Sequence, residues 1–365
     1  MEERCRWGII GTGKIASVMA GALASSATGQ LVAVASRSED RARRFATDVG
    51  IDRHYSGYEA LIADPDVEIV YVSGHHTTHH ACATAAAEAG KHVLCEKPLA
   101  MNAALATDIV EAARRNGVFL MEAFAYRCHP QTERLVKILS NGDIGQVRIV
   151  DSAFGYDAGA APDNYLLVRE LGGGSILDVG CYPTSMAHLI AATASGGETA
   201  PTIDVGGAGY LGPTTGVDHY AAAVLSYDCD MIARVASAVQ VNLDSTLRIY
   251  GTEGTVTVPS PWLPGRVAAE RAAPVIVVHR YGATAQEIPV DAAADLYVLE
   301  ADAVGRLVRE GRTSHPLMSW DESLANMATI DRWRAAIGLT YPDDENEPTP
   351  GATVARDKLM PAGGA

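Results

Sequence analysis

The first third of the chain alternates short apolar runs with segments of helical spacing. Continuous apolar runs such as Leu31–Ala35 and Val67–Ser73 are typical of strands that are buried on both faces of a sheet. The segments between the runs, such as Thr77–Ala89 and Asn102–Arg115, have the composition and length of helices. This alternation predicts a parallel, doubly wound α/β sheet with right-handed crossovers over residues 1–123.

After residue 123 the pattern changes to short alternating segments joined by tight turns, which favours antiparallel pairing. The expected strands are Gln146–Tyr156, Val217–Tyr227, Met231–Val241, Leu247–Gly251 and Gly254–Pro259. Helices near Leu296–Arg309 and Asp321–Gly338 close the fold. We therefore expect a second, α+β domain over 124–340, with an open and mostly antiparallel sheet. The stretch 341–365 is rich in Pro, Gly and acids, and we expect a mobile or loosely docked tail.

A glycine turn follows the first predicted strand and opens a helix. Its sequence, GTGKIA, matches the dinucleotide-binding pattern G-x-G-x-x-A in the required context. The first glycine permits the tight turn, the second lets the backbone approach a pyrophosphate, and Ala16 allows close helix–strand packing. A plain turn in an α/β protein is the alternative. The residues expected to contact the cofactor here are Gly11, Thr12, Gly13, Lys14 and Ile15.

The end of the second predicted strand decides between NAD and NADP. An acidic residue there would bind the ribose hydroxyls of NAD. This chain has Ser36 and Arg37 instead, and a hydroxyl and a guanidinium suit a 2′-phosphate. Glu39 and Asp40 come slightly too late to be the ribose acid. We expect NADP, with NAD as the less favoured cofactor.

Composition excludes several classes of partner. The 365 residues carry 29 Lys and Arg against 44 Asp and Glu, a formal net charge of −15. That charge disfavours nucleic-acid binding and a polybasic membrane anchor. No apolar run approaches the ~18–20 residues that span a bilayer, and the acidic N-terminus does not resemble a signal peptide. Six scattered cysteines without a C-x-x-C pair are typical of reduced thiols, so we expect a cytoplasmic protein.

Two further segments carry candidate chemistry. Lys97 lies between Glu96 and a proline after the fifth strand, at the sheet edge where open α/β sheets bind ligands. The glycine-rich segment 172–183 places Asp178 and Tyr182 four residues apart, on one face of a continuous helix. Pro183 either starts such a helix or kinks it. A Tyr beside a Lys can exchange a proton with a substrate. A surface Lys in a turn and a packed Tyr are the alternatives.

Four motifs in this order and spacing resemble the Gfo/Idh/MocA oxidoreductase family, over about residues 5–340. They are GIIGTGKIA at 8–16, EKPLAMN at 96–102, MEAFAYRCHP at 121–130 and GGGSILDVGCYP at 172–183. Within the family, the branch of dimeric dihydrodiol dehydrogenases and sugar ketoreductases is the most similar.

The resemblance implies roles for individual residues. Lys97 matches the lysine that orients substrate and nicotinamide and aids proton transfer, and the bond to the following proline is often cis in the family. Tyr182 matches the acid–base residue of the family's D-x-G-x-H/Y motif. Asp178 matches the aspartate of that motif, expected to contact a substrate hydroxyl. Tyr126 and Arg127 match a segment that borders the nicotinamide and the substrate.

A histidine-rich segment marks a departure from the family. His79 matches the family histidine, whereas His75 replaces the usual proline. The spacing of His75 to His79 and of His76 to His80 also suits a helical metal site. No carboxylate or thiolate lies within the cluster, so we expect no metal. We expect His75, His76 and His79, together with Glu96, to contact the cofactor.

Together these features predict an NAD(P)-dependent oxidoreductase acting on a secondary alcohol or ketone of a sugar, cyclic polyol or dihydrodiol. Tyr182 would exchange the hydroxyl proton and Lys97 would stabilise the alkoxide. We expect the substrate between the domains, and a homodimer or homotetramer formed through the uncovered sheet face. An NAD-dependent glycosidase acting by transient oxidation and a non-catalytic dinucleotide-sensing regulator are the alternatives. The presence of both Lys97 and Tyr182 disfavours the regulator.

Overall fold

A computed structural model describes residues 4–159, 161, 164–197, 199–266 and 273–344. Its described residues form two compact units. The first unit contains the described residues up to Ala123 together with Tyr297–Trp320. The second contains Phe124–Leu296 and Asp321–Asp344. None of the helices in this described part combines the length and apolar character that a bilayer crossing requires.

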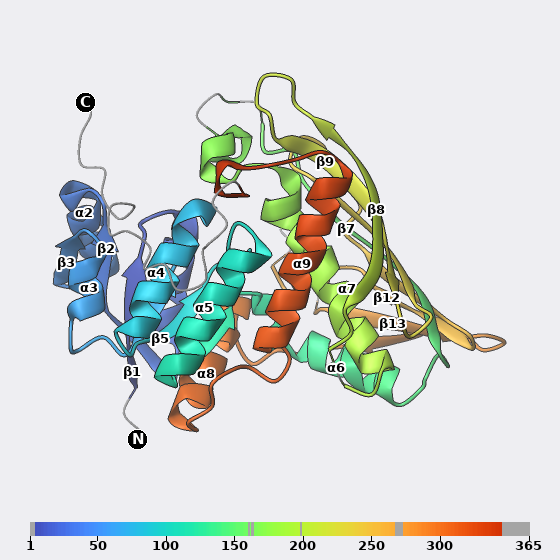
Figure 1. Cartoon of the computed structure of the whole chain (residues 1–365). Helices are drawn as coiled ribbons and strands as arrows, with labels where there is room; N and C mark the ends of the chain where they lie inside the picture. The colour runs from blue at the N-terminus through green and yellow to red at the C-terminus, as the bar shows by residue number, and fades with distance from the viewer. Residues whose placement is uncertain (1–3, 160, 162–163, 198, 267–272, 345–365) are drawn as a thin grey trace. The chain divides into compact units, whose positions relative to one another are not determined.

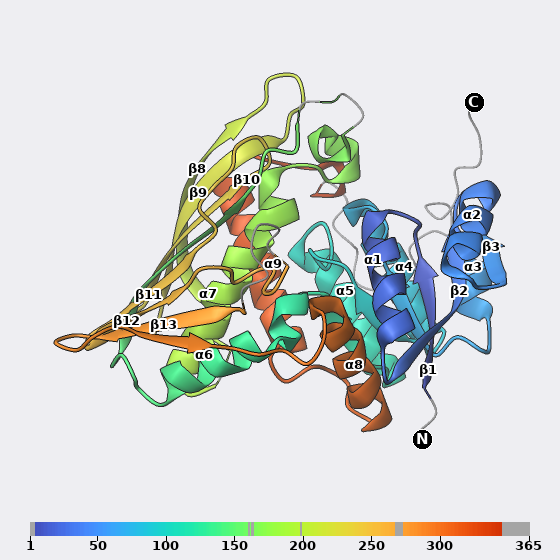
Figure 2. The same cartoon turned by 180° about the vertical axis from the view of Figure 1, so that it is seen from behind.

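In the described residues of the first unit, a six-stranded parallel sheet has the order β3-β2-β1-β4-β5-β6. Helices α4 and α5 cover one face of this sheet, and α1 and α8 lie on the other (Figures 1 and 2). The strands are β1 (Cys5–Ile10), β2 (Gly29–Ser36), β3 (Arg53–Ser56), β4 (Ile69–Val72), β5 (His92–Cys95) and β6 (Leu120–Glu122). The helices are α1 (Lys14–Ser25), α2 (Glu39–Val49), α3 (Glu59–Ala63), α4 (His76–Glu88), α5 (Ala103–Asn116) and α8 (Leu296–Arg309). The predicted doubly wound sheet is confirmed.

Local sequence explains where these elements begin and end. The strand β4 is fully buried, and β5 is apolar and buried after its first residue, His92, because both faces of the sheet are covered. The side chain of Ser38 accepts from the backbone N–H of Arg41 at the start of α2, and Asn102 caps α5 in the same way. Gly50 and Gly117 end these two helices in the left-handed conformation that glycine adopts most easily.

The second unit contains, within its described residues, an eight-stranded sheet of order β14-β13-β12-β11-β7-β10-β9-β8. Its pairs are antiparallel except β7 with β10, so the predicted open, mostly antiparallel sheet is confirmed. Helices α7 and α9 lie against one face (Figure 1). The strands are β7 (Val147–Gly155), β8 (Thr202–Leu211), β9 (Asp218–Tyr227), β10 (Ile232–Ala238), β11 (Leu247–Gly251), β12 (Gly254–Val258), β13 (Val275–Arg280) and β14 (Gln286–Pro289). The helices are α6 (Pro130–Ser140), α7 (Cys181–Ala194) and α9 (Trp320–Ala336).

The sequence did not predict the two edges of this sheet. Strand β8 has the sequence TIDVGGAGYL, and its glycines hide the strand signal because they have low β-propensity. It forms because β9 pairs with it along nearly its whole length. At the other edge, β13 and β14 were also missed. The sheet is therefore wider than the alternation of apolar residues indicated.

The division into units differs from the predicted domains at residues 297–320, which belong with the first unit. The carboxylate of Asp302 in α8 accepts from the backbone N–H groups of Ala27 and Thr28, at 2.9 and 3.1 Å. The N–H of Leu120 in β6 donates to the carbonyl of Thr313 at 3.0 Å. Long-range hydrogen bonds of this kind leave no trace in the local pattern.

The beginning of the predicted tail is packed rather than mobile. Tyr341 is fully buried, and Arg334 forms an ion pair of 3.0 Å with Asp344. The rest of that predicted segment, 345–365, lies outside the described residues. The prediction of a loosely docked tail was therefore wrong for its first four residues.

Candidate active site

The glycine turn between β1 and α1 has the backbone that its sequence predicts. Gly11 has a φ of +109°, and a Cβ there would lie 2.9 Å from the carbonyl oxygen of Ser73. Gly13 is the N-cap of α1, and a Cβ there would meet no described atom within 4 Å. Since glycine offers no capping side chain, the first N–H groups of α1 are available to an anion. Thr12 and Ile15 are half-buried, whereas Lys14 is exposed at this end of the helix.

Two arginines lie near the end of β2. Ser36 is buried there, and Arg37 is exposed. Arg41, in the first turn of α2, is close enough to His75 for its positive charge to act on that histidine together with the charge of Arg37. Burial and then these two positive charges lower the pKa of His75. Sequence reasoning missed Arg41, although its spacing of four residues from Arg37 was a signal that could have been used.

The histidines at the start of α4 have different environments. His75 is the half-buried N-cap residue, and His76 and His79 are buried. The rings of His76 and His79 meet edge to face, with centroids 5.7 Å apart. His80 lies 3.4 Å from the carboxylate of Asp108. Among the described residues, no group of three or more His, Cys, Asp or Glu side chains is arranged to hold a metal ion.

The loop after β5 holds Lys97 through its neighbours. Lys97 is half-buried, and its bond to Pro98 is cis, as the resemblance implied. The hydroxyl of Tyr71 donates to Oε1 of Glu96, and the backbone N–H of Lys97 lies 3.3 Å from Oε2 of the same carboxylate. Burial and the negative charge of Glu96 raise the pKa of Tyr71 well above its ordinary value. Glu96 therefore fixes the loop, and its oxygens have protein partners.

Asp178 and Tyr182 lie in one helical run that changes type between them. Ile176–Gly180 forms a π-helical turn, and α7 begins at Cys181 with Pro183 in its first turn. The π-helical turn is a feature often found at functional sites. The preceding loop is anchored by Asp218, whose Oδ2 accepts from the hydroxyl of Ser175 at 2.6 Å.

Tyr156 orients the carboxylate of Asp178. Its hydroxyl donates to Oδ2 of Asp178 at 2.7 Å, and Asp178 is only 5% exposed. Tyr156 comes directly after β7 and lies 22 residues before its partner. No feature of the sequence signalled this pair.

Aromatic rings surround Tyr182, which is half-buried. The rings of Phe124 and Phe154 meet it edge to face, each with centroids 5.1 Å away. Trp262 and Tyr126 are also near, at 5.9 and 6.0 Å. Such contacts restrain the ring plane, so the direction of the phenolic O–H bond is limited to rotation about its C–O bond.

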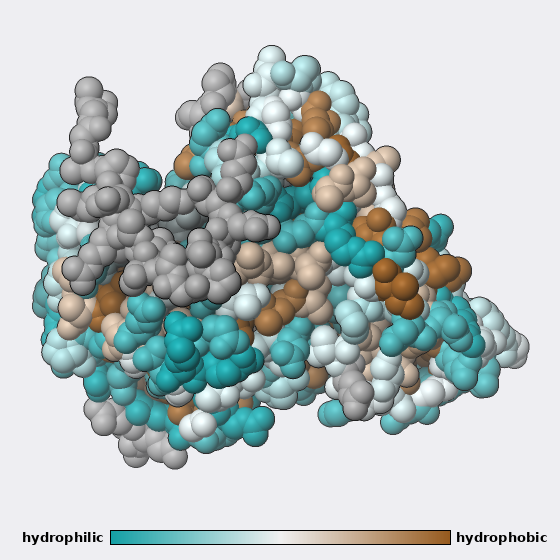
Figure 3. Space-filling model, in the orientation of Figure 1, coloured by the Kyte–Doolittle hydropathy of each residue, from teal (hydrophilic) through white to brown (hydrophobic). Residues whose placement is uncertain are grey.

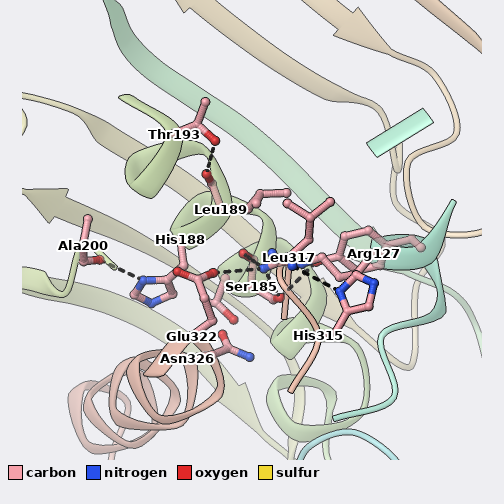
Figure 4. Close-up of polar contacts among 12 residues, drawn as sticks. Arg127, Ser185, His188, Leu189, Thr193, Ala200, His315, Leu317, Glu322 and Asn326 are labelled. Atoms are coloured by element: carbon pink, nitrogen blue, oxygen red, sulfur yellow. Dashed lines mark hydrogen bonds and ion pairs between the residues drawn. The ribbon is translucent and has the colours of Figure 1, made fainter. Parts of the chain in front are cut away.

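Arg127 is held inside the second unit by its own network (Figure 4). Its guanidinium donates to the carbonyl of Ser185 at 2.6 Å and to the hydroxyl of Tyr126 at 3.1 Å. It also pairs with Glu322 at 3.4 Å. Burial raises the pKa of Glu322, while Arg127 opposes that shift. The structure thus brings Tyr126 to the Tyr182 ring, and places the Arg127 guanidinium in a buried ion pair.

Comparisons with known proteins agree with this geometry. The family model described as "Oxidoreductase family, NAD-binding Rossmann fold" matches residues 5–124, and the "GFO/IDH/MocA C-terminal domain" matches residues 132–257. Trans-1,2-dihydrobenzene-1,2-diol dehydrogenase from Xenopus tropicalis is 31% identical over 92% of this chain and 99% of its own length. The Mus musculus protein of the same name is 33% identical over 93% and 99%.

A solved structure is also similar to this chain over nearly its whole length. The 3-ketoreductase from Actinomadura kijaniata, in complex with NADP and TDP-benzene, superimposes with a TM-score of 0.80. It is 26% identical, and the match covers 92% of this chain and 98% of the other. With both domains matched and relatives aligned along almost their whole length, the chain belongs to the Gfo/Idh/MocA oxidoreductase family.

Proposed function

We propose that this protein is an NADP-dependent oxidoreductase that interconverts a secondary alcohol and a ketone on a sugar, cyclic polyol or dihydrodiol. The observation that carries the proposal is that each of the two units holds one restrained residue of the required chemistry. Lys97 lies on a loop held by Glu96, and Tyr182 is the second residue of α7, within a cluster of aromatic rings. The names of the relatives, dihydrodiol dehydrogenases and a ketoreductase, support this reaction class.

The residues at the end of β1 fit a dinucleotide. A side chain at Gly11 would collide with Ser73, and the N-terminus of α1 carries no acidic residue in its first turn. Gly11–Ile15 would hold the diphosphate, and His76 would line the same cofactor site. When bound, NADP supplies the hydride acceptor for oxidation and the hydride donor for reduction.

Side chains of the protein transfer the proton of the substrate hydroxyl and stabilise the negative charge on its oxygen. In the reduction direction, the hydroxyl of Tyr182 gives its proton to the alkoxide oxygen of the substrate and becomes a phenolate; in the oxidation direction, that phenolate takes up the proton of the substrate alcohol. The ammonium of Lys97 stabilises the negative charge that develops on the oxygen. The carboxylate of Asp178, oriented by Tyr156, accepts a hydrogen bond from a neighbouring substrate hydroxyl. Tyr126 borders the substrate through its ring, and Arg127 holds Tyr126 in place.

A substrate panel tests the proposal directly. Polyols, sugars and dihydrodiols are offered to the protein with NADP and with NAD, and reduced nicotinamide is followed by its absorbance. Turnover of at least one secondary alcohol with NADP is expected. Glycoside hydrolysis without net cofactor turnover would instead favour the glycosidase. Tight dinucleotide binding without turnover of any substrate would favour the regulator.

The 2′-phosphate of NADP is assigned to Ser36, Arg37 and Arg41, with His75 beside them. Replacing Arg41 with alanine removes one charge-assisted hydrogen bond, which contributes about 1.5–3 kcal/mol, so the KM for NADP is expected to rise about 10- to 100-fold. The KM for NAD, which lacks this phosphate, should stay within about 2-fold. Arg37→Ala should behave in the same way.

Arg43→Ala is the matched control for this prediction. Arg43 lies on the same helix, is exposed, and forms its ion pair with Asp40 at 2.8 Å. Its removal should leave the KM for NADP unchanged. A wild-type protein that uses NAD as well as NADP would contradict the assignment of the two arginines.

Self-association through the outer face of the second unit's sheet is also part of the proposal. Large apolar side chains are exposed there, among them Val224 and Ile232, which are 49% and 45% exposed. The rings of Tyr210 and Tyr220 stack on each other beside a hollow of about 430 Å³ lined by small residues such as Ala208 and Ala222. Figure 3 shows part of this apolar surface over β8. The two stacked tyrosines form a ridge beside this hollow. In a two-fold symmetric dimer, the ridge of each copy can fill the hollow of the other.

Ala222→Glu is expected to convert the protein to the mass of one chain in light scattering, because it would bury an unpaired carboxylate in the hollow that the partner covers. Tyr281→Glu, at an exposed site after β13, should keep the wild-type mass. A wild-type protein with the mass of a single chain would contradict this assembly. None of the six cysteines, all of which lie in the described residues, forms a disulfide, which supports a cytoplasmic location.

A further inference from the structure

His79 occupies an unusual position beneath the lysine loop. Its side chain is fully buried, and each ring nitrogen faces a backbone carbonyl from a different loop. Nδ1 lies 2.8 Å from the carbonyl oxygen of Pro98, and Nε2 lies 3.2 Å from that of Gly74. Pro98 follows Lys97, and Gly74 lies in the segment between β4 and α4. One imidazole therefore bridges the ends of two neighbouring parallel strands.

The loop around Lys97 is held at three consecutive residues. The N–H of Lys97 meets Oε2 of Glu96, and the N–H of Leu99 donates to Oε1 of Glu122 at 2.9 Å. Between them, the carbonyl of Pro98 meets His79. Glu96 directly follows β5 and Glu122 ends β6, so both hold the loop to the sheet. His79 belongs to α4 and therefore connects the same loop to that helix.

The protonation state of the ring follows from its surroundings. Burial lowers the pKa of His79 to about 4, the two carbonyls oppose that shift, and the charges of Lys97 and His75 add to it. A neutral imidazole has a single N–H, so only one of the two carbonyls can receive a hydrogen bond. The shorter distance, at Nδ1, has the usual length of an N–H···O bond. The shorter contact therefore favours the tautomer whose N–H is on Nδ1 and donates to the carbonyl of Pro98.

We propose that His79 is a positioning residue for Lys97. As the Nδ1–H tautomer, His79 holds the Pro98 carbonyl against the start of α4. The inference rests on the proposed function, in which Lys97 meets the reacting oxygen. His79 itself is too buried to touch the substrate. A displacement of about 1 Å at a catalytic group can lower a rate about 100-fold, so a loosened loop would impair turnover.

A residue that merely fills the core would not need this chemistry. The neighbouring interior of α4 consists of Cys82, Ala83, Ala86 and Ala87, all small and fully buried. Burying the N–H of an imidazole is unfavourable unless it donates a hydrogen bond, and an apolar side chain would fill the same space without that requirement. Both ring nitrogens instead point at carbonyls of the loops that border the proposed site.

Two conservative variants distinguish a role in positioning Lys97 from a role in which His79 only fills space in the core. The amide nitrogen of Asn can replace Nδ1, whereas that of Gln reaches the place of Nε2. His79→Asn should keep kcat within about 5-fold of wild type, and His79→Gln should lower kcat about 10- to 100-fold. The KM for NADP should stay within about 3-fold in both, because the phosphate contacts are elsewhere. Equal losses in the two variants, or a loss only in the KM for NADP, would overturn the proposal.

Lys97→Ala distinguishes failure of this inference from failure of the proposed function. Lys97→Ala is expected to keep a measurable residual kcat, and adding His79→Gln should lower that residual kcat no further, because the histidine acts through the lysine. A further loss would overturn the positioning role. If Lys97→Ala keeps full activity, the proposed function itself fails.

The tautomer can be measured in the unaltered protein, even if a variant does not fold. With ¹⁵N-labelled histidine, long-range ¹H–¹⁵N spectra at pH 7 should show one ring protonated at Nδ1 and unprotonated at Nε2. This signal should be absent from the spectrum of His79→Asn. A His79 ring protonated at Nε2, or at both nitrogens, would contradict the assignment.

Discussion

Tyr182→Phe is expected to lower kcat by about 10²- to 10⁴-fold, the usual contribution of a positioned proton donor or acceptor. The substitution removes only the hydroxyl. The ring keeps its edge-to-face contacts with Phe124 and Phe154, so neither the helix start nor the aromatic cluster should change. The dissociation constant for NADP should be that of the wild type. Steady-state kinetics and fluorescence titration with NADP measure the two quantities.

The same chemical change elsewhere provides the control. Tyr281 is 57% exposed and lies after β13, so Tyr281→Phe should leave kcat unaltered. If Tyr182→Phe turned over at near-normal speed, the phenol would not be the proton-exchanging group. A search for another acid would then begin with Asp178, the titratable group in the same helical run.

Lys97→Ala is the second large effect, with an expected loss of about 10²- to 10³-fold in kcat, as for other donors that stabilise a developing oxyanion. The backbone bonds of the loop do not involve the lysine side chain, because they use the N–H of Lys97 and the carbonyl of Pro98. The loop should therefore keep these backbone hydrogen bonds in the variant. Lys97→Met, which keeps most of the stem, should lose as much activity as Lys97→Ala if the charge is responsible.

The double variant tests whether the two residues serve one reaction step. Groups that act as a unit are strongly non-additive, so Lys97→Ala with Tyr182→Phe should be little slower than the slower single variant. Multiplied losses would mean that the two side chains act independently. That result would contradict the shared roles assigned to them.

Much of the fold follows from short-range sequence patterns. The glycine turn at Gly11 and the apolar strand β4 depend on residues adjacent in sequence, so the pattern alone is enough to locate them. The edge strand β8 could not be predicted in the same way. Its glycines carry no strand preference, and pairing with β9 is what makes it a strand.

The candidate site shows the same limit. Lys97 and Tyr182 were found because their motifs are contiguous, whereas the interaction of Arg41 with His75 arises only because the fold brings the starts of α2 and α4 together. The inward direction of Arg127 could not be predicted, because a charged residue is usually exposed and its partner Glu322 is 195 residues away. The pair of Tyr156 and Asp178 depends on side-chain direction beyond a strand end, which periodicity does not give.

The return of residues 297–320 to the first unit has a consequence for building chimeras. A nucleotide-binding module taken from this chain as residues 1–123 would lack the carboxylate of Asp302 and the carbonyl of Thr313. The N–H groups of Ala27 and Leu120 would lose these acceptors, that of Thr28 would keep only the hydroxyl of Ser26, and the surface of the sheet covered by α8 would be left bare. A single crossover with a relative near residue 123 would therefore join mismatched pieces. Exchanging cofactor preference between relatives requires a two-piece graft that carries both segments from the same parent.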